Sequence, residues 1–158
     1  MDHVSTGESG TLGELSWRVL WPPPSGVEPG NPASVALLVQ PTTACRCLSG
    51  IFPGDLGEES QRRLLGALRQ SGGVPRVDVV KVAHHGSADQ DAGLYDELDA
   101  VVGLIGVGAD NDYGHPSDAL LGILAAAGTT PERSDLDGLV LVAPGDEPGR
   151  VRVWTERG

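Results

Sequence analysis

Three polar clusters in the sequence follow apolar stretches and carry side chains that could bind a metal ion or a phosphate. They are Phe52–Asp55, Lys81–Ser87 with its adjacent histidines, and Asp110–Pro116. Carboxylate and neutral imidazole groups are ordinary ligands of Zn²⁺ and Mn²⁺. Because open α/β sheets gather functional groups where their strands end, we expect the three clusters to lie near one another.

Asp55 follows Gly54 at the point where a predicted strand passes into a predicted helix. One interpretation makes the carboxylate a metal ligand. The other makes it a helix N-cap that accepts hydrogen bonds from backbone N–H groups, which is a common role for Asp in this position.

His84 and His85 come at the end of the predicted strand Val77–Ala83. Successive residues of an extended strand point to opposite faces, so we expect only one of the two histidines to serve a given site directly. The other would orient it as a hydrogen-bonding partner. After an Asp in the equivalent position of the preceding strand, the pair indicates half of a metal site.

The third cluster places His115 just ahead of the predicted helix Ser117–Ala127, with Asn111 and Tyr113 earlier in the loop. Free amides at a helix N-terminus attract anions, so a phosphate held by His115 and these amides is one interpretation. The other is a turn capped by Asn and Asp side chains, which leaves Tyr113 and His115 without a role.

Apolar periodicity predicts an α/β fold with a mixed sheet and flanking helices. The polar, glycine-rich residues 1–14 predict a disordered or boundary segment ahead of a single domain, residues 15–158. The predicted strands are Leu15–Trp21, Ser34–Val39, Ala44–Phe52, Val77–Ala83, Val101–Val107, Leu139–Val142 and Arg150–Trp154. The predicted helices are Leu56–Gln70, Asp91–Leu98 and Ser117–Ala127.

The chain of 158 residues has a formal net charge of -11. Binding to nucleic acid through phosphate contacts normally requires a basic stripe, and the sequence shows none. Positive charge for any contact with DNA would therefore come from metal ions or from another part of the protein. Otherwise the acidity is that of a solvated surface. The sequence shows neither a signal peptide nor an apolar run of membrane length.

Cys45 and Cys47 are separated by a single residue. This spacing makes an intramolecular disulfide geometrically awkward, so we expect two small, partly buried thiols. On a strand both would point to the same face. The surrounding stretch offers too few further Cys or His residues to predict a metal site there.

The order of the short motifs resembles the metallo-β-lactamase-like domain of ComEC-type DNA internalisation proteins. The resemblance runs from about Trp17 to the C-terminus and rests on Asn31–Ser34, Gly54–Asp55, Lys81–Ser87, Asn111–Pro116, and Ser134–Asp135 with Gly138. It implies an αββα sandwich, of which this chain would be the C-terminal portion.

The resemblance also implies a centre of two divalent ions, Zn²⁺ or Mn²⁺, in the intact domain. Asp55 would bridge the two ions and His85 would complete one of them, with His84 as the alternative ligand or a substrate contact. The residues implied in catalysis are His84, Asn111, Tyr113 and His115.

The main metal motif of that superfamily, a run ending in Asp-His, should precede Trp17 and is absent there. Asp2 and His3 form the only candidate. We therefore expect either a chain cut within the domain or a degenerate member of the group.

The implied function is degradation of the DNA strand that a competence channel does not import. The setting would be the extracytoplasmic side of a bacterial inner membrane. The partners would be DNA and the membrane channel domain of the same polypeptide, without a small-molecule cofactor. Two alternatives stay open: a non-catalytic module that packs on a channel or positions DNA, and a stand-alone metallohydrolase of another ester.

Overall fold

The computed structural model describes residues 4–42, 45–147 and 149–157. Asp2 and His3 lie outside these residues. The strands are β1 (Ser9–Leu12), β2 (Leu15–Trp21), β3 (Ala36–Pro41), β4 (Gly50–Phe52), β5 (Val79–Lys81), β6 (Val102–Ile105), β7 (Thr130–Arg133), β8 (Val140–Pro144) and β9 (Val151–Thr155). The α-helices are α1 (Glu58–Gln70), α2 (Ala92–Leu98), α3 (Asp118–Ala126) and α4 (Ser134–Asp137). Within the described ranges, no helix is both long and apolar enough to span a bilayer.

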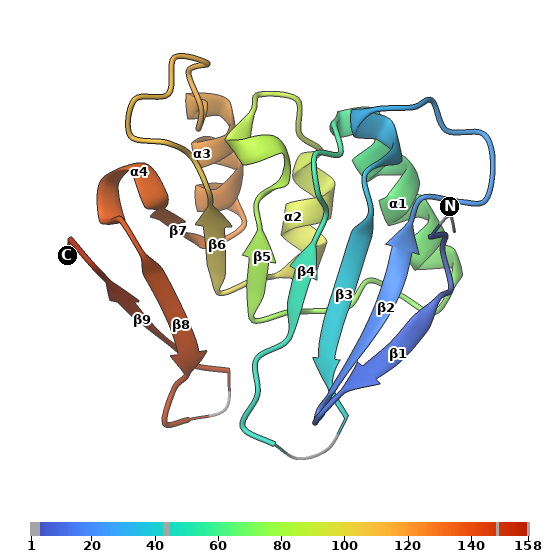
Figure 1. The fold of residues 1–158 in the computed structure, drawn as a ribbon, viewed down its shortest axis with the longest axis horizontal. Helices are drawn as coiled ribbons and strands as arrows, with labels where there is room; N and C mark the ends of the chain where they lie inside the picture. Colours follow the sequence, from blue (N-terminus) through green and yellow to red (C-terminus); the bar gives the residue numbers. More distant parts are fainter. Residues whose placement is uncertain (1–3, 43–44, 148, 158) are drawn as a thin grey trace.

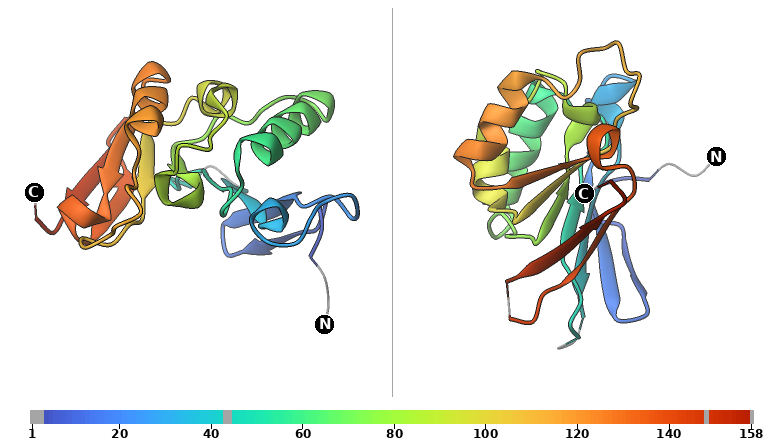
Figure 2. Two further views of the ribbon diagram at one scale, coloured as in Figure 1. Left: turned by 90° about the horizontal axis from the view of Figure 1, so that it is seen from above. Right: turned by 90° about the vertical axis from the view of Figure 1, so that its left-hand side faces the viewer.

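Strands β1 to β7 form one mixed sheet in sequence order. Neighbouring strands from β1 to β4 pair antiparallel, and those from β4 to β7 pair parallel. Helices α1, α2 and α3 connect the parallel strands and lie on the same face of the sheet (Figures 1 and 2). Strands β8 and β9 form a separate antiparallel pair. The carboxyl ends of the parallel strands β4 to β7 therefore lie at the same edge of the sheet, where the polar clusters follow them.

The core lies between this sheet and the three helices. Alternate residues of β3, such as Ala36 and Leu38, enter it, as the period of an extended chain requires. The helices contribute leucines at intervals of three and four residues. The core includes Leu38, Ile51, Val80, Ile105, Leu64, Leu68, Leu94, Leu98, Leu120 and Leu124.

The predicted α/β class with a mixed sheet is confirmed, and the arrangement is consistent with an αββα sandwich. The three predicted helices form within two residues of their expected ends. Strand β1 lies in the segment expected to be disordered, where it pairs with β2. The predicted strand Ala44–Phe52 is wrong over most of its length: only Gly50–Phe52 is a strand, and Ala44 lies outside the described residues.

The expectation of two free thiols is also wrong, because Cys45 and Cys47 form a disulfide. The segment from Cys45 to Ser49 is irregular, so the side chains are not held to the alternation of a strand. The two Cα atoms lie 5.3 Å apart, within the range that a disulfide spans. Both cysteines are partly buried, as expected.

We predict that this disulfide contributes little to stability, because it closes a loop with a single intervening residue. In the chain-entropy account such a loop contributes about 1–2 kcal/mol. The variant Cys45→Ser/Cys47→Ser should therefore unfold with a free energy lower by that amount in urea titration. Leu64→Ala, at a core position that is fully buried, is the reference and should lose about 2–5 kcal/mol. A loss from the cysteine variant as large as that from Leu64→Ala would contradict this prediction.

Candidate functional site

The three polar clusters meet at the carboxyl edge of the parallel strands. Asp55 follows β4, His84 and His85 follow β5, and the loop from Gly106 to Pro116 follows β6. Strands β4, β5 and β6 are parallel neighbours, so these connections emerge side by side (Figure 1). The fold thus places the clusters where open α/β sheets usually hold functional groups.

The Asn31–Ser34 motif fixes the position of Asp55. The backbone N–H of Asp55 donates to Ser34 Oγ over 3.1 Å. Gly54 has a φ of 62°, and a Cβ there would lie 2.8 Å from the Cβ of Ser34. A side chain at this turn is therefore excluded both by the backbone conformation and by the close approach of Ser34.

Asp55 is not the N-cap of α1. The N-cap is Gly57, which has no side chain, and the N–H of Glu58 donates to Asp89 Oδ1 over 3.1 Å. The Asp55 carboxylate is thus left for another role, and the N-cap interpretation is wrong.

The histidines do not lie on an extended strand. Strand β5 ends at Lys81, and His84 and His85 adopt left-handed conformations with φ of 45° and 54°. The expectation that their side chains point to opposite faces is therefore wrong, because it assumed an extended backbone. Both residues line one cleft. The His84 N–H donates to Gly54 O over 3.0 Å, which joins this loop to the one that carries Asp55.

Gly86 lets the histidine loop pack against the start of α3. It has a φ of 88°, and a Cβ there would lie 2.7 Å from the Cβ of Pro116. The N–H of Ser117 donates to Gly86 O over 2.8 Å. The glycine of the His-His-Gly-Ser sequence is thus required by both conformation and space.

A buried polar network, which sequence reasoning missed, supports the loop from below. Gln90 Nε2 donates to Ala83 O over 3.1 Å, and the Tyr95 hydroxyl donates to Gln90 Oε1 over 2.7 Å. Gln61 Nε2 also donates to Gln90 Oε1, over 2.8 Å. Burial raises the pKa of Tyr95, while its contact with the Ala83 N–H opposes that shift. Gln61 precedes Leu64 by three residues and Leu65 by four, so it lies on the apolar face of α1. This spacing is the sequence signal that could have predicted a buried glutamine.

Asp55 and His85 face each other across the site. His85 Nε2 lies 3.8 Å from Asp55 Oδ1. His85 Nδ1 lies 2.6 Å from Gly106 O. A carbonyl oxygen can only accept, so Nδ1 carries a proton, and Nε2 faces Asp55 and is the ring atom left for a metal ion. A backbone carbonyl that fixes the tautomer in this way is the usual partner of a metal-binding histidine.

The donor chemistry of this pair suits Zn²⁺ or Mn²⁺. Ligand atoms about 2.0–2.2 Å from an ion can lie up to about 4.2 Å apart, so one ion could contact both residues. The side chains of His85 and Asp55 are 52% and 43% exposed, so an ion can reach them. Among the described residues, the pair has no third His, Cys, Asp or Glu close enough to complete a ligand set. The residues fit such an ion but supply only part of its coordination.

His84 lines the cleft together with His85. Its Nε2 is 3.3 Å from Asn31 Nδ2, which gives the Asn31–Ser34 motif a second role. Its Nδ1 is buried and has no hydrogen-bond partner within the described part of the chain. The ring also lines a smaller hollow that contains Asp55 and Asn31.

The cleft holds all the residues expected to act in catalysis. It has a volume of about 590 Å³ and is lined by His84, His85, Gly106, Val107, Gly108, Asn111, Tyr113, His115 and Ser134. The His84 and His115 rings lie 5.9 Å apart in an edge arrangement, and the Tyr113 and His115 rings lie 6.2 Å apart. Tyr113 is 84% exposed and so stands at the mouth of the cleft.

Asn111 holds the shape of this loop. Its Nδ2 donates to His115 O over 2.5 Å, and its Oδ1 accepts from the Tyr113 N–H over 3.0 Å. Both ends of the side chain amide are therefore engaged within the loop. This geometry positions Tyr113 and His115 rather than offering Asn111 itself to a substrate.

The helix N-terminus beyond His115 is partly occupied by side chains of the same turn. Helix α3 begins at Asp118, and its N-cap Ser117 accepts from the Leu120 N–H. Asp118 adds a carboxylate in the first turn. Ser117 thus occupies one amide of the first turn, and the Asp118 carboxylate opposes a bound anion there. A phosphate held by His115 and the remaining amides stays a prediction.

Lys81, the single lysine of the chain, lies on the sheet side of the site. Its Nζ donates to Val82 O over 2.8 Å. Burial lowers the pKa of Lys81, and the negative charge of Asp55 opposes that shift. The cation thus offsets part of the acidic charge near the candidate ligands.

Comparison with known proteins gives one relevant similarity. The chain is 25% identical over 141 residues to ComE operon protein 3 of Bacillus subtilis (strain 168). The aligned region covers 89% of this chain but only 17% of that protein. No family model and no solved structure matches the chain.

We predict that the chain with its disulfide intact binds Mn²⁺ or Zn²⁺ only weakly, since two ligands fall short of the usual three or four. His85→Ala should abolish the remaining binding in isothermal titration. His84→Ala should weaken it less, by about 10–100-fold, as loss of an outer partner does. His115→Ala is the control and should leave binding unchanged. Tight binding of two ions by the chain would show that its site is complete, and a larger loss from His84→Ala than from His85→Ala would reverse the ligand assignment.

Proposed function

We propose that this chain is part of a metal-dependent phosphodiesterase domain that cleaves DNA in a competence-related protein. The observation that carries the proposal is the position of His85 Nε2, held toward Asp55 by the bond of Nδ1 to the Gly106 carbonyl at the edge of a histidine-lined cleft. The similarity to ComE operon protein 3 agrees with the DNA-uptake role that the motif order implies. A position on the extracytoplasmic side of the inner membrane, beside a channel domain of the same polypeptide, belongs to the same proposal.

Each residue of the cleft has a distinct part in this proposal. Asp55 and His85 would hold a divalent ion, which when bound supplies a nucleophilic hydroxide and charge stabilisation. His115 would donate a hydrogen bond to a non-bridging oxygen of the scissile phosphate, and the His84 ring would contact the substrate as part of the cleft wall. Tyr113, exposed at the mouth, offers an aromatic face on which an unpaired base can stack.

The charge of the chain limits how DNA can bind. With a net charge of -11 the protein gains nothing from general attraction to phosphates. Contacts must therefore be local, through the metal ions and the rings of the cleft. This favours a short single-stranded segment as substrate over a long duplex.

A second candidate function is a non-catalytic module that positions DNA or packs against a channel. The observation that favours it is the ligand count, since the Asp55–His85 pair lacks a third protein ligand among the described residues. In that case the cleft would bind DNA without cleaving it.

The two functions are separated by cleavage of single-stranded DNA with Mn²⁺, in a form of the domain that also carries an Asp-His metal motif. We predict that Asp55→Asn abolishes cleavage and that His115→Ala lowers its rate by about 100-fold, as loss of one preorganised donor does. His115→Ala should leave metal content and the thermal midpoint unchanged.

Asp112→Ala, at an exposed position of the same loop, is the matched control and should cleave normally. Unchanged cleavage by folded His115→Ala would make the loop structural. DNA binding without any cleavage would establish the non-catalytic module instead.

A further inference from the structure

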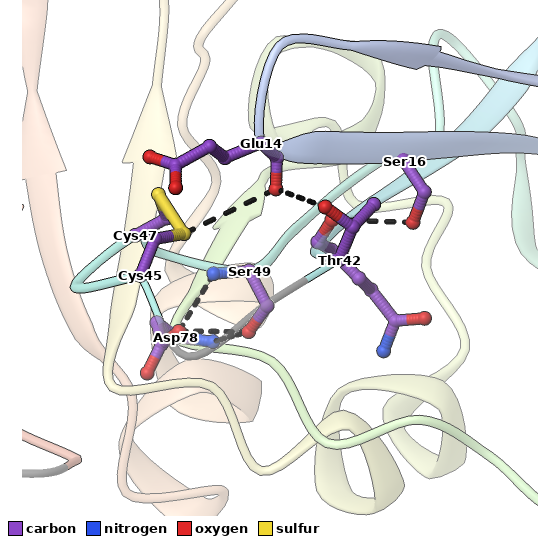
Figure 3. The surroundings of a disulfide bond; sticks show 8 residues. Glu14, Ser16, Thr42, Cys45, Cys47, Ser49 and Asp78 are labelled. Carbon is purple, nitrogen blue, oxygen red and sulfur yellow. Dashed lines mark hydrogen bonds between the residues drawn. A yellow bond between two sulfur atoms is a disulfide. The ribbon is translucent and has the colours of Figure 1, made fainter.

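A second group of metal-binding atoms lies at the opposite edge of the sheet from the Asp55 site. A carboxylate oxygen of Glu14 and the sulfur atoms of Cys45 and Cys47 all lie within 4.8 Å of one another. Figure 3 shows the Glu14 side chain extending over the disulfide. Strands β2 and β3 separate Glu14 from the two cysteines in the sequence. Glu14 therefore reaches the cysteines through the fold and not through local spacing.

The turn that carries Glu14 is held to this loop without the help of the disulfide. Glu14 O accepts from the Thr42 N–H over 2.8 Å and from Thr42 Oγ1 over 2.9 Å. These contacts extend the pairing of β2 with β3. The Glu14 backbone therefore keeps its place beside the loop whatever the state of the sulfur atoms.

The other end of the loop is also fixed independently. Both the N–H and the hydroxyl of Ser49 donate to Asp78 Oδ2 over 2.7 Å, and the Asp78 N–H donates to Ser49 Oγ over 3.0 Å. Opening the disulfide thus frees two thiols in a loop whose ends remain in place.

Arg46, between the two cysteines, is bound by the connection between β8 and β9. Its guanidinium donates to Gly145 O over 2.5 Å and lies 4.0 Å from Asp146, in the connection between β8 and β9. The cation is held against the hairpin, and Cys45 and Cys47 line a cleft of about 540 Å³ with it. The cysteine side of the group can therefore be reached by an ion.

We propose that Glu14, Cys45 and Cys47 form a zinc site that exists only when the Cys45–Cys47 disulfide is reduced. Two thiolates and one carboxylate, with water in the fourth position, give the tetrahedral coordination that Zn²⁺ adopts. With Zn–S bonds of about 2.3 Å the sulfur atoms would stand about 3.8 Å apart, which Cα atoms 5.3 Å apart permit. The bound ion would tie the β1–β2 turn to the β3–β4 connection.

A dithiol reductant would open the disulfide. Its two thiols give two electrons and two protons to the disulfide, which becomes two thiols while the reductant closes to its own disulfide. Zinc then displaces the two thiol protons to the solvent. Oxidation reverses both steps and expels the ion, so the site reports the redox state of its surroundings.

The test titrates Co²⁺, a spectroscopic substitute for Zn²⁺, into the chain after reduction with a phosphine and removal of the reagent under nitrogen. The reduced chain should bind one Co²⁺ with a thiolate-to-cobalt charge-transfer band, and added Zn²⁺ should remove the band and raise the thermal midpoint. The oxidised chain and Cys45→Ser/Cys47→Ser should show no band. Glu14→Gln should weaken binding by at least about tenfold, a loss that even outer partners of a metal produce.

Two controls make the result specific. Glu28→Gln changes another exposed glutamate and should bind Co²⁺ like the unmodified chain. Asp55→Asn/His85→Ala should keep the band, which separates this site from the proposed phosphodiesterase centre. The proposal is overturned if the reduced chain shows no charge-transfer band, if the band survives in Cys45→Ser/Cys47→Ser, or if Glu14→Gln binds as tightly as Glu28→Gln.

Discussion

The buried side-chain amide of Gln90 holds the histidine loop, and the candidate site depends on that contact. It donates to Ala83 O and accepts from the Tyr95 hydroxyl, which in turn accepts from the Ala83 N–H. Consecutive non-glycine residues in the left-handed region each raise the energy by about 1–3 kcal/mol, so His84 and His85 keep this conformation only where the surroundings fix it. The network therefore supplies part of the energy that keeps both rings in one cleft.

The fold was predictable where one physical signal dominated. The apolar stripes of α1, α2 and α3 and the alternation of β2 located these elements, since burial on one face imposes the period. Strands β1 and β7 were not predictable. The first has a largely exposed, polar sequence that becomes a strand by pairing with β2. The second contains Pro131, which is tolerated because β7 is an edge strand of the sheet.

The sequence allowed us to predict which residues lie in the candidate site, but not how their side chains are arranged. The motif order identified Asp55, His85 and His115, yet the opposite-face argument failed because it treated a left-handed loop as a strand. The tautomer of His85 depends on Gly106 O, a contact made 21 residues away. The cysteine pair illustrates the same limit: local spacing offered too few ligands, whereas strand pairing supplies Glu14 from another turn.

The two ends of strand β4 therefore carry donor sets of different chemical character. At the carboxyl end, imidazole and carboxylate groups suit ions such as Zn²⁺ and Mn²⁺. These groups are not oxidised or reduced, so their ability to bind an ion does not depend on redox conditions. At the amino end, thiolates prefer soft ions and are available only after reduction. An acidic chain without a basic stripe gains positive charge most readily from bound cations. Oxidation would direct such cations to the Asp55–His85 pair, because closing the disulfide removes the competing ligands while leaving the histidine loop untouched.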